Sequence, residues 1–249
     1  GNTTRRFALP FEVQGGGEPI ADPIFASARL RGSGMGIGGS IGIYFQPSAL
    51  VSLGLNFRSG TTLDIQEGEA NFDVPSSLEQ QFPSSTFQTT LQLPGSINFG
   101  LGYRPSDELT VTMDANYVLW ETTSNTIIEF EETLPNFEYP GSADLGYQNT
   151  IVIRMGAEYH LSDDVYVRAG TFFDQSPVTD GFVSPELPDA NTVGFTGGVS
   201  FQVTDNLGLD MTFQFETTGE RTTFFEDRRF GGTYQSNNTV IGLGLVWKY

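Results

Sequence analysis

The sequence predicts an all-β protein, an antiparallel up-and-down transmembrane β-barrel, and three observations point to this fold class. Apolar and polar residues alternate with a period of two in nine segments, the pattern of strands with one apolar and one polar face. The connections between the segments are alternately short and long, as in barrels with short periplasmic turns and longer extracellular loops. No run of 18 apolar residues is present, so a membrane-spanning helix is not expected.

The alternation gives each segment an apolar face and a polar face. In segment 207–216, Leu209 and Met211 fall on the apolar face. The residues between and after them, Asp210 and Thr212, fall on the polar face. Since successive side chains of a strand point to opposite sides, each segment is predicted as one strand. In chain order the nine predicted strands span 36–45, 51–58, 96–103, 109–120, 151–160, 165–174, 193–203, 207–216 and 241–249.

The connections predict which end of the barrel faces which compartment. Tight turns rich in Pro, Ser, Asp and Asn, the residues that such turns favour, join the strands in pairs at 46–50, 104–108, 161–164 and 204–206. Long polar stretches are predicted as extracellular loops near 66–87, 122–147, 176–190 and 218–234. The predicted organisation is an extracellular loop and strand lead-in over 1–33, followed by a transmembrane barrel portion over 34–249.

The same alternation also fits a soluble β-sandwich, in which the apolar face packs on a second sheet and the polar face meets water. The barrel is favoured because segments of about ten residues match a tilted membrane-crossing strand, and because the polar face is rich in Gly and small polar residues. Aromatic residues also lie on the apolar face at segment ends, as in the girdles of membrane barrels. These residues are Phe45, Phe57, Tyr103, Tyr117, Tyr159, Phe201, Trp247 and Tyr249. The sandwich stays open as an alternative.

Composition excludes several classes of function. The chain has no Cys and a single histidine, His160, so disulfides, thiol nucleophiles, Cys-ligated zinc and multi-His metal sites are excluded. Thirty acidic residues against twelve basic ones give a formal net charge of -18, which repels phosphate backbones and argues against a nucleic-acid partner. No pair of carboxylates stands in a recognisable catalytic frame. We therefore expect no enzyme activity, no cofactor and no resident metal.

Several motifs carry a resemblance to a known family. Residues 93–107 read LPGSINFGLGYRPSD and precede a strand that ends in Leu119-Trp120. The other motifs are RMGAEY at 154–159, RAGTFFDQSPV at 168–178 with LPDAN at 187–191, and GSGMGIG at 32–38. Taken together over about residues 28–249, they resemble the FadL/OmpP1/TodX outer-membrane transporters of long-chain fatty acids and aromatic hydrocarbons. Met35 stands where that family usually has Trp.

The resemblance implies a barrel of about fourteen strands with a small N-terminal hatch, and the nine strands predicted here resemble its last nine. The hatch, the earlier strands and the kinked strand that opens a lateral exit in the family have no counterpart in this sequence. The chain is therefore expected to be a C-terminal portion, or to be completed by another chain, because an open sheet would leave unpaired strand edges in lipid.

The resemblance also implies a function and a location. The expected function is an outer-membrane channel for passive uptake of long-chain fatty acids or other hydrophobic compounds, in a Gram-negative bacterium. The expected partners are outer-membrane lipid, lipopolysaccharide and a hydrophobic small-molecule ligand. The alternative left open is a non-transporting barrel subunit of an outer-membrane secretion or assembly complex, which would bind other outer-membrane proteins.

A fatty-acid ligand would need a cation for its carboxylate, and Arg154 and Arg168 are the candidates on the polar face. A structural role stays open for Arg168, because Glu158 faces the same side across a tight hairpin and the two are expected to pair. Aromatic side chains on this face could line a path for an apolar ligand, or only fill space. These candidates are Tyr44, Trp120, Tyr166 and Phe172.

Overall fold

The protein forms antiparallel β-strands that group into two compact units. The computed structural model describes residues 2–8, 25–74, 83–123, 125–130, 142–183, 189–225 and 230–247. One unit comprises Gly1–Ile37, Thr61–Leu93 and Asn125–Asp144, and the other comprises Gly38–Gly60, Pro94–Ser124 and Leu145–Tyr249. Within the described ranges, no helix has both the length and the apolar character needed to cross a membrane.

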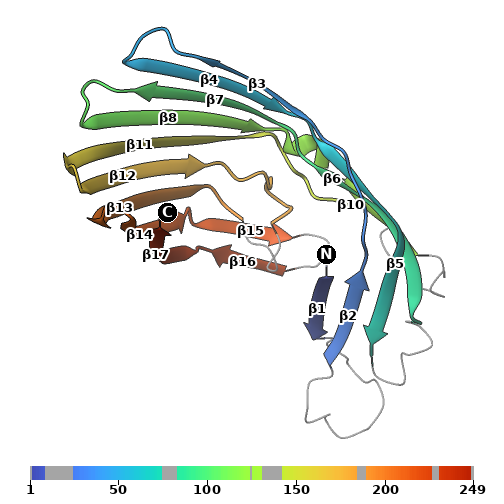
Figure 1. Ribbon diagram of the computed structural model, residues 1–249. Coiled ribbons are helices and arrows are strands. Elements are labelled where there is room, and N and C mark those ends of the chain that lie inside the picture. Colours follow the sequence, from blue (N-terminus) through green and yellow to red (C-terminus); the bar gives the residue numbers. More distant parts are fainter. Residues whose placement is uncertain are drawn as a thin grey trace, which may run out of the picture. The chain divides into compact units, whose positions relative to one another are not determined.

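The second unit contains a sheet of nine antiparallel strands (Figure 1). The strands are β3 (Ser40–Phe45), β4 (Val51–Arg58), β7 (Ser96–Tyr103), β8 (Leu109–Val118), β11 (Thr150–Ser162), β12 (Val165–Asp174), β13 (Thr192–Thr204), β14 (Leu207–Thr218) and β17 (Asn237–Trp247). They pair in the order β17-β14-β13-β12-β11-β8-β7-β4-β3, so each strand lies beside the sheet strand that precedes it in the chain. These are the nine strands predicted from the alternation, and the all-β, antiparallel, up-and-down prediction is confirmed.

The short connections of this sheet are tight turns, as the sequence predicts. Backbone hydrogen bonds also join three of these turns to a neighbouring hairpin. The N–H of Arg104 donates to the carbonyl of Leu50 at 2.7 Å, and the N–H of Gln202 donates to the carbonyl of Asp164 at 2.7 Å. The edge strands β3 and β17 do not pair with each other in the described part of the chain, so the sheet is not closed into a barrel.

The first unit contains a sheet of six antiparallel strands. Its members are β1 (Asn2–Ala8), β2 (Phe25–Arg31), β5 (Thr61–Asp73), β6 (Ser85–Leu93), β9 (Asn125–Phe130) and β10 (Ser142–Asp144), in the order β1-β2-β5-β6-β9-β10. A separate two-stranded sheet in the second unit pairs β15 (Arg221–Phe225) with β16 (Phe230–Tyr234).

These additional strands differ from the sequence prediction, which placed long loops near 66–87, 122–147, 176–190 and 218–234. Strands β5, β6, β9, β10, β15 and β16 occupy parts of three of these stretches. The reason is that Thr, Ile and Phe within them favour extended backbone, and pairing of neighbouring segments satisfies the backbone polar groups. Alternation is weak there because the register of β5 with β6 shifts between Ile65 and Gly68.

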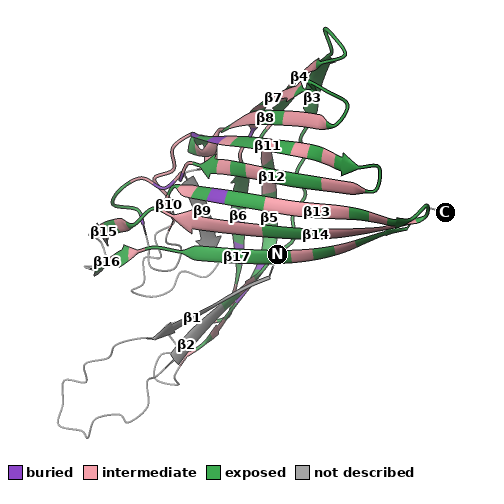
Figure 2. Ribbon diagram, turned by 90° about the vertical axis from the view of Figure 1, so that its left-hand side faces the viewer, coloured by how far each residue is buried: buried purple, intermediate pink, exposed green. Residues whose placement is uncertain are grey.

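The apolar face of the nine-stranded sheet is exposed. Exposed residues occur along the strands of this sheet (Figure 2). Every strand contributes large apolar side chains to the exposed set, for example Ile43, Leu55, Phe99, Met113, Met155, Val167, Phe195, Met211 and Leu243. On β17, Ile241, Leu243 and Leu245 are 75%, 74% and 75% exposed. A soluble sandwich would bury this face beneath a second sheet, whereas these side chains are exposed. Extended rows of exposed apolar residues are instead what lipid-facing strands present.

The two faces of the sheet predict opposite tolerance to charge. We expect Leu243→Arg to impair folding into lipid vesicles, because a cation on a lipid-facing position near the bilayer centre costs about 2–4 kcal/mol. Thr212→Arg is the matched control, since Thr212 lies on the polar face of the neighbouring strand, opposite Gly242. Urea titration of the vesicle-folded protein, followed by gel mobility, measures the difference. Equal destabilisation by both substitutions would contradict the assigned faces.

Candidate functional site

A chain of polar side chains crosses four strands of the polar face. Arg168 on β12 donates from Nε to Glu158 Oε2 on β11 at 2.6 Å, and from Nη1 to Ser200 Oγ on β13 at 2.5 Å. Ser200 Oγ donates in turn to Asp210 on β14. On the other side, Nε2 of His160 lies 3.3 Å from Glu158 Oε1. The predicted pairing of Glu158 with Arg168 is confirmed. The Arg168 guanidinium is therefore bonded to residues of the sheet itself, Glu158 and Ser200.

Arg154 lies at a different level of the same face. Its Nη1 is 3.1 Å from Asp114 Oδ1, directly across from it on β8. Both side chains are about half exposed, at 47% and 48%. Two glycines continue this row, and a Cβ placed on Gly54 or Gly100 would have no atom within 4 Å. The Arg154 guanidinium therefore borders open space beyond its single ion pair.

The structure separates the four aromatic candidates. Phe172 lies opposite Arg154 in the register, and its ring fills the space where a Cβ on Gly194 would be, so only glycine fits there. Tyr166 packs edge-on against His160, with ring centroids 4.5 Å apart. Tyr44 is on the edge strand β3 and is 69% exposed.

The sequence predicted Trp120 at the end of a strand spanning 109–120, and this placement is wrong. Strand β8 ends at Val118, and Trp120 begins a 3-10 helix, η1 (Trp120–Thr123). The turn into this helix is stabilised by Thr122, whose Oγ1 donates to the carbonyl of Leu119 at 2.7 Å. The indole consequently stands edge-on to Tyr147, with ring centroids 5.8 Å apart.

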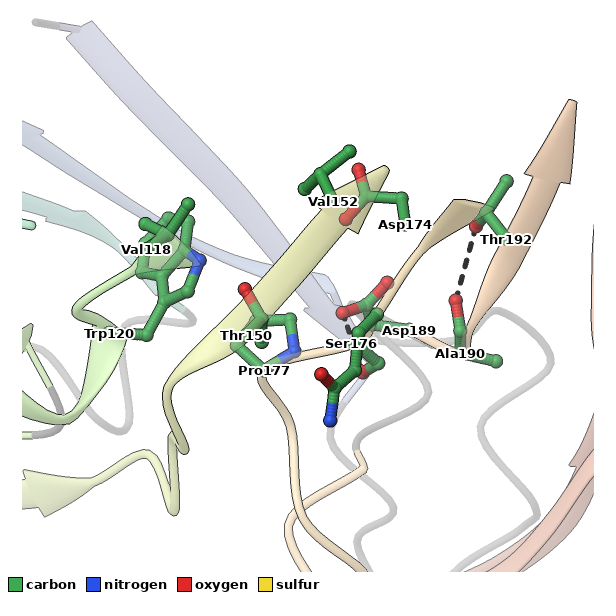
Figure 3. Close-up of a pocket in the computed structure, with 11 residues that line it drawn as sticks. Val118, Trp120, Thr150, Val152, Asp174, Ser176, Pro177, Asp189, Ala190 and Thr192 are labelled. Carbon is green, nitrogen blue, oxygen red and sulfur yellow. Dashed lines mark hydrogen bonds between the residues drawn. The ribbon is translucent and has the colours of Figure 1, made fainter. Parts of the chain in front are cut away.

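Trp120 lines a cavity of about 380 Å³ at one end of the sheet (Figure 3). The cavity lies on the polar face, since its strand residues come from the polar rows of β8, β11, β12 and β13. The lining residues are Val118, Trp120, Thr150, Val152, Asp174, Gln175, Ser176, Pro177, Asp189, Ala190 and Thr192. Of the six predicted site residues only Trp120 is among them. Ser176, Pro177, Asp189 and Ala190 were missed because 176–190 was treated as a loop, and the others because they lie at or near strand ends, where no motif marked them as ligand candidates. The motifs at 168–178 and 187–191 contain several of them and were the available signal.

Ser176 anchors the chain segment that forms one wall of the cavity. This residue is 5% exposed. Its backbone N–H donates to Asn191 Oδ1 at 2.9 Å, and its Oγ donates to Asp189 Oδ2 at 2.8 Å. The N–H of Val178 donates back to Ser176 Oγ at 3.2 Å. The segment that follows β12 is thereby tied to the start of β13.

Arg221 of β15 clamps the same segment from behind. Its side chain is 16% exposed, and Nη2 lies 2.8 Å from Asp180 Oδ1. Nη2 also donates to the carbonyl of Val178 at 2.7 Å, and Nη1 donates to the carbonyl of Asp189 at 2.9 Å. One guanidinium thus bonds to polar groups near both ends of this segment, at Val178 and Asp180 and at Asp189.

A nine-stranded up-and-down sheet with exposed apolar rows on one face and paired polar residues on the other defines the wall of a transmembrane β-barrel. Over residues 21–249 the sequence matches the family described as "Outer membrane protein transport protein (OMPP1/FadL/TodX)". The chain belongs to this family, which confirms the resemblance found in its motifs. Its location is the bacterial outer membrane.

Individual relatives agree with this family. Outer membrane protein P1 of Haemophilus influenzae is 22% identical over 242 residues, which cover 93% of this chain and 51% of the relative. The long-chain fatty acid transport protein of Salmonella typhi is 22% identical over 214 residues, covering 78% of this chain and 46% of the relative. The chain thus spans about half the length of the curated relatives it matches.

Solved structures share the fold. A FadL homologue from Pseudomonas aeruginosa superposes with a TM-score of 0.68 at 18% identity, covering 92% of this chain and 55% of that one. The Pseudomonas putida toluene transporter TodX superposes with a TM-score of 0.55 at 16% identity, covering 88% and 52%. This chain therefore covers about half the length of these structures.

The Arg221 clamp predicts a local effect on stability. We expect Arg221→Met to release the segment around Ser176, because charge-assisted hydrogen bonds contribute about 1.5–3 kcal/mol each. Cleavage within 175–191 by a protease added to the folded protein should become roughly tenfold faster or more, while the sheet itself stays folded. Arg104→Met, in an exposed turn, is the control for charge loss. An unchanged cleavage rate in the Arg221 variant would show that the clamp contributes nothing.

Proposed function

We propose that this protein forms part of an outer-membrane channel for passive uptake of hydrophobic compounds, long-chain fatty acids among them. The observation that carries the proposal is a polar barrel face that combines a half-exposed guanidinium at Arg154 with an aromatic-lined cavity at Trp120. The printed names of relatives support it, since one is a long-chain fatty acid transport protein and another a toluene transporter.

In this proposal Arg154 receives the head group of carboxylate ligands. Its ion pair with Asp114 leaves guanidinium donors unused by any described residue, and a carboxylate can accept two of them side by side. Phe172, directly across from Arg154, would meet the apolar chain next to that head group. Arg168, Tyr166 and Tyr44 stay ligand predictions of lower rank, because Arg168 and Tyr166 contact wall residues and Tyr44 stands on an edge strand.

We infer a channel rather than an enzyme. Passive uptake needs no reacting group, and the family is described as one of transport proteins. The proposed partners are the hydrophobic ligand on the polar face, and outer-membrane lipid and lipopolysaccharide against the exposed apolar rows. Girdle residues such as Tyr117 and Tyr159, exposed at 42% and 48%, would meet the interfacial region of the bilayer.

The test is uptake by bacteria that lack their own transporter of this type and express the full-length protein. We expect uptake of both radiolabelled oleate and toluene. Arg154→Gln should reduce oleate uptake roughly tenfold through loss of a charge-assisted contact, and should leave toluene uptake unchanged.

Arg104→Gln, in an exposed turn away from the polar rows, controls for the change in charge. Absence of uptake of both compounds, with the protein correctly inserted, would contradict the proposal; a non-transporting subunit gives that result. Equal loss of oleate and toluene uptake in the Arg154 variant would refute the role given to Arg154 alone.

A further inference from the structure

The cavity lined by Trp120 has an apolar side suited to a small hydrophobic body. Its apolar lining comes from Val118 at the end of β8, Trp120 just after it, Val152 on β11, and Pro177 and Ala190 in the segment between β12 and β13. Val152 is 5% exposed, so this side is well packed. A volume of about 380 Å³ is at the small end of ligand pockets.

The lining also contains two carboxylates, which lie next to these apolar groups. Asp174 and Asp189 are the charged lining residues, and no basic residue lines the cavity. Asp189 accepts a hydrogen bond from Ser176. Asp174, at the end of β12, has no hydrogen-bond or ion-pair partner among the described residues, and its carboxylate lies beside Val152 at the cavity (Figure 3). The free acceptor therefore lies on Asp174.

Two guanidinium groups lie near these carboxylates, and each has a carboxylate partner of its own. Arg154 is directed to Asp114, at 3.1 Å. Arg221 is directed to Asp180, at 2.8 Å, and to backbone carbonyls. The remaining polar lining groups, on Thr150, Gln175, Ser176 and Thr192, are uncharged.

We propose that this cavity is a binding site for small apolar compounds whose head group donates a hydrogen bond, an alcohol or an amine, and that it rejects carboxylates. The head group would donate to Asp174, while the apolar body contacts Trp120, Val152 and Pro177. A carboxylate placed there would face two like charges, with no cation among the lining residues. This site would extend the ligands of the proposed channel beyond the carboxylates assigned to Arg154. It rests on the proposed function in one respect: ligands would reach the cavity through the channel.

Four probes with the same ring and different head groups test the inference: benzyl alcohol, benzylamine, toluene and benzoate. Binding is measured by equilibrium dialysis against the full-length protein in nanodiscs, with empty nanodiscs to correct for partition into lipid. All four probes are measured on Arg154→Gln, with and without the Asp substitutions below, because Arg154 is the proposed carboxylate site and would bind benzoate independently of the cavity. We expect benzylamine and benzyl alcohol to bind more tightly than toluene, and benzoate to bind at least about tenfold more weakly than benzylamine, from the loss of one charge-assisted contact.

Asp174→Asn keeps the shape of the side chain and removes its charge. It should lower benzylamine affinity about tenfold and benzyl alcohol affinity less, and leave toluene binding unchanged. The difference in affinity between benzylamine and benzoate should become smaller. Asp163→Asn, in the turn at the other end of the same hairpin, is the matched control and should change none of the four affinities.

Benzoate binding as tight as benzylamine binding to Arg154→Gln, which lacks the proposed carboxylate site, would overturn the inference, whatever the effect of the Asp174 substitution. So would equal loss of toluene and benzylamine binding in Asp174→Asn. If uptake of oleate and toluene persists in either case, the proposed channel stands and only the donor preference fails. If uptake is absent while the donor preference holds, the channel fails and the binding site stands.

Discussion

The structure depends on one constraint: inside a bilayer, backbone N–H and C=O groups have no water to bond with, so each strand must pair with its neighbours along its length. Nine strands of this chain do so in one continuous antiparallel sheet. Pairing fixes the register, and the register decides which side chains face lipid. A slip of one residue in β11 would turn Arg154 to the lipid and Met155 to the polar face, so sequence alternation and strand pairing enforce each other.

Polar contacts hold neighbouring strands together on the face that lacks lipid. Few of the described apolar residues are buried. Three of them lie in the unit that contains the nine-stranded sheet: Val152, Val178 and Val183. The pairs Asp114–Arg154 and Glu158–Arg168 instead join adjacent strands directly. At the end of the sheet near Trp120 the arrangement changes, because the segment after β12 forms one wall of a cavity whose lining includes two carboxylates.

The sequence predicts the regular part of this fold and little of the cavity. A period of two is a local signal, so all nine strands and the Glu158–Arg168 pair follow from it. Trp120 was misplaced because a distant residue helps to set its turn: Asn149 accepts from the N–H of Glu121, 28 residues earlier. The cavity wall depends on Arg221 reaching Ser176 across 45 residues. Neither contact leaves a periodic trace in the sequence, and the strands β5 and β6 were missed because their register shift breaks the alternation.

The central claim is that odd and even residues of one strand face different media, and spin labels along β14 test it most directly. Single labels at positions 209 to 214 would be compared in bilayers for their accessibility to oxygen, which concentrates in lipid, and to a water-soluble nickel complex. The account predicts high oxygen accessibility at Leu209, Met211 and Phe213. Low oxygen accessibility is predicted at Asp210, Thr212 and Gln214. Accessibility to oxygen without this alternation, or water contact at all six positions, would contradict it.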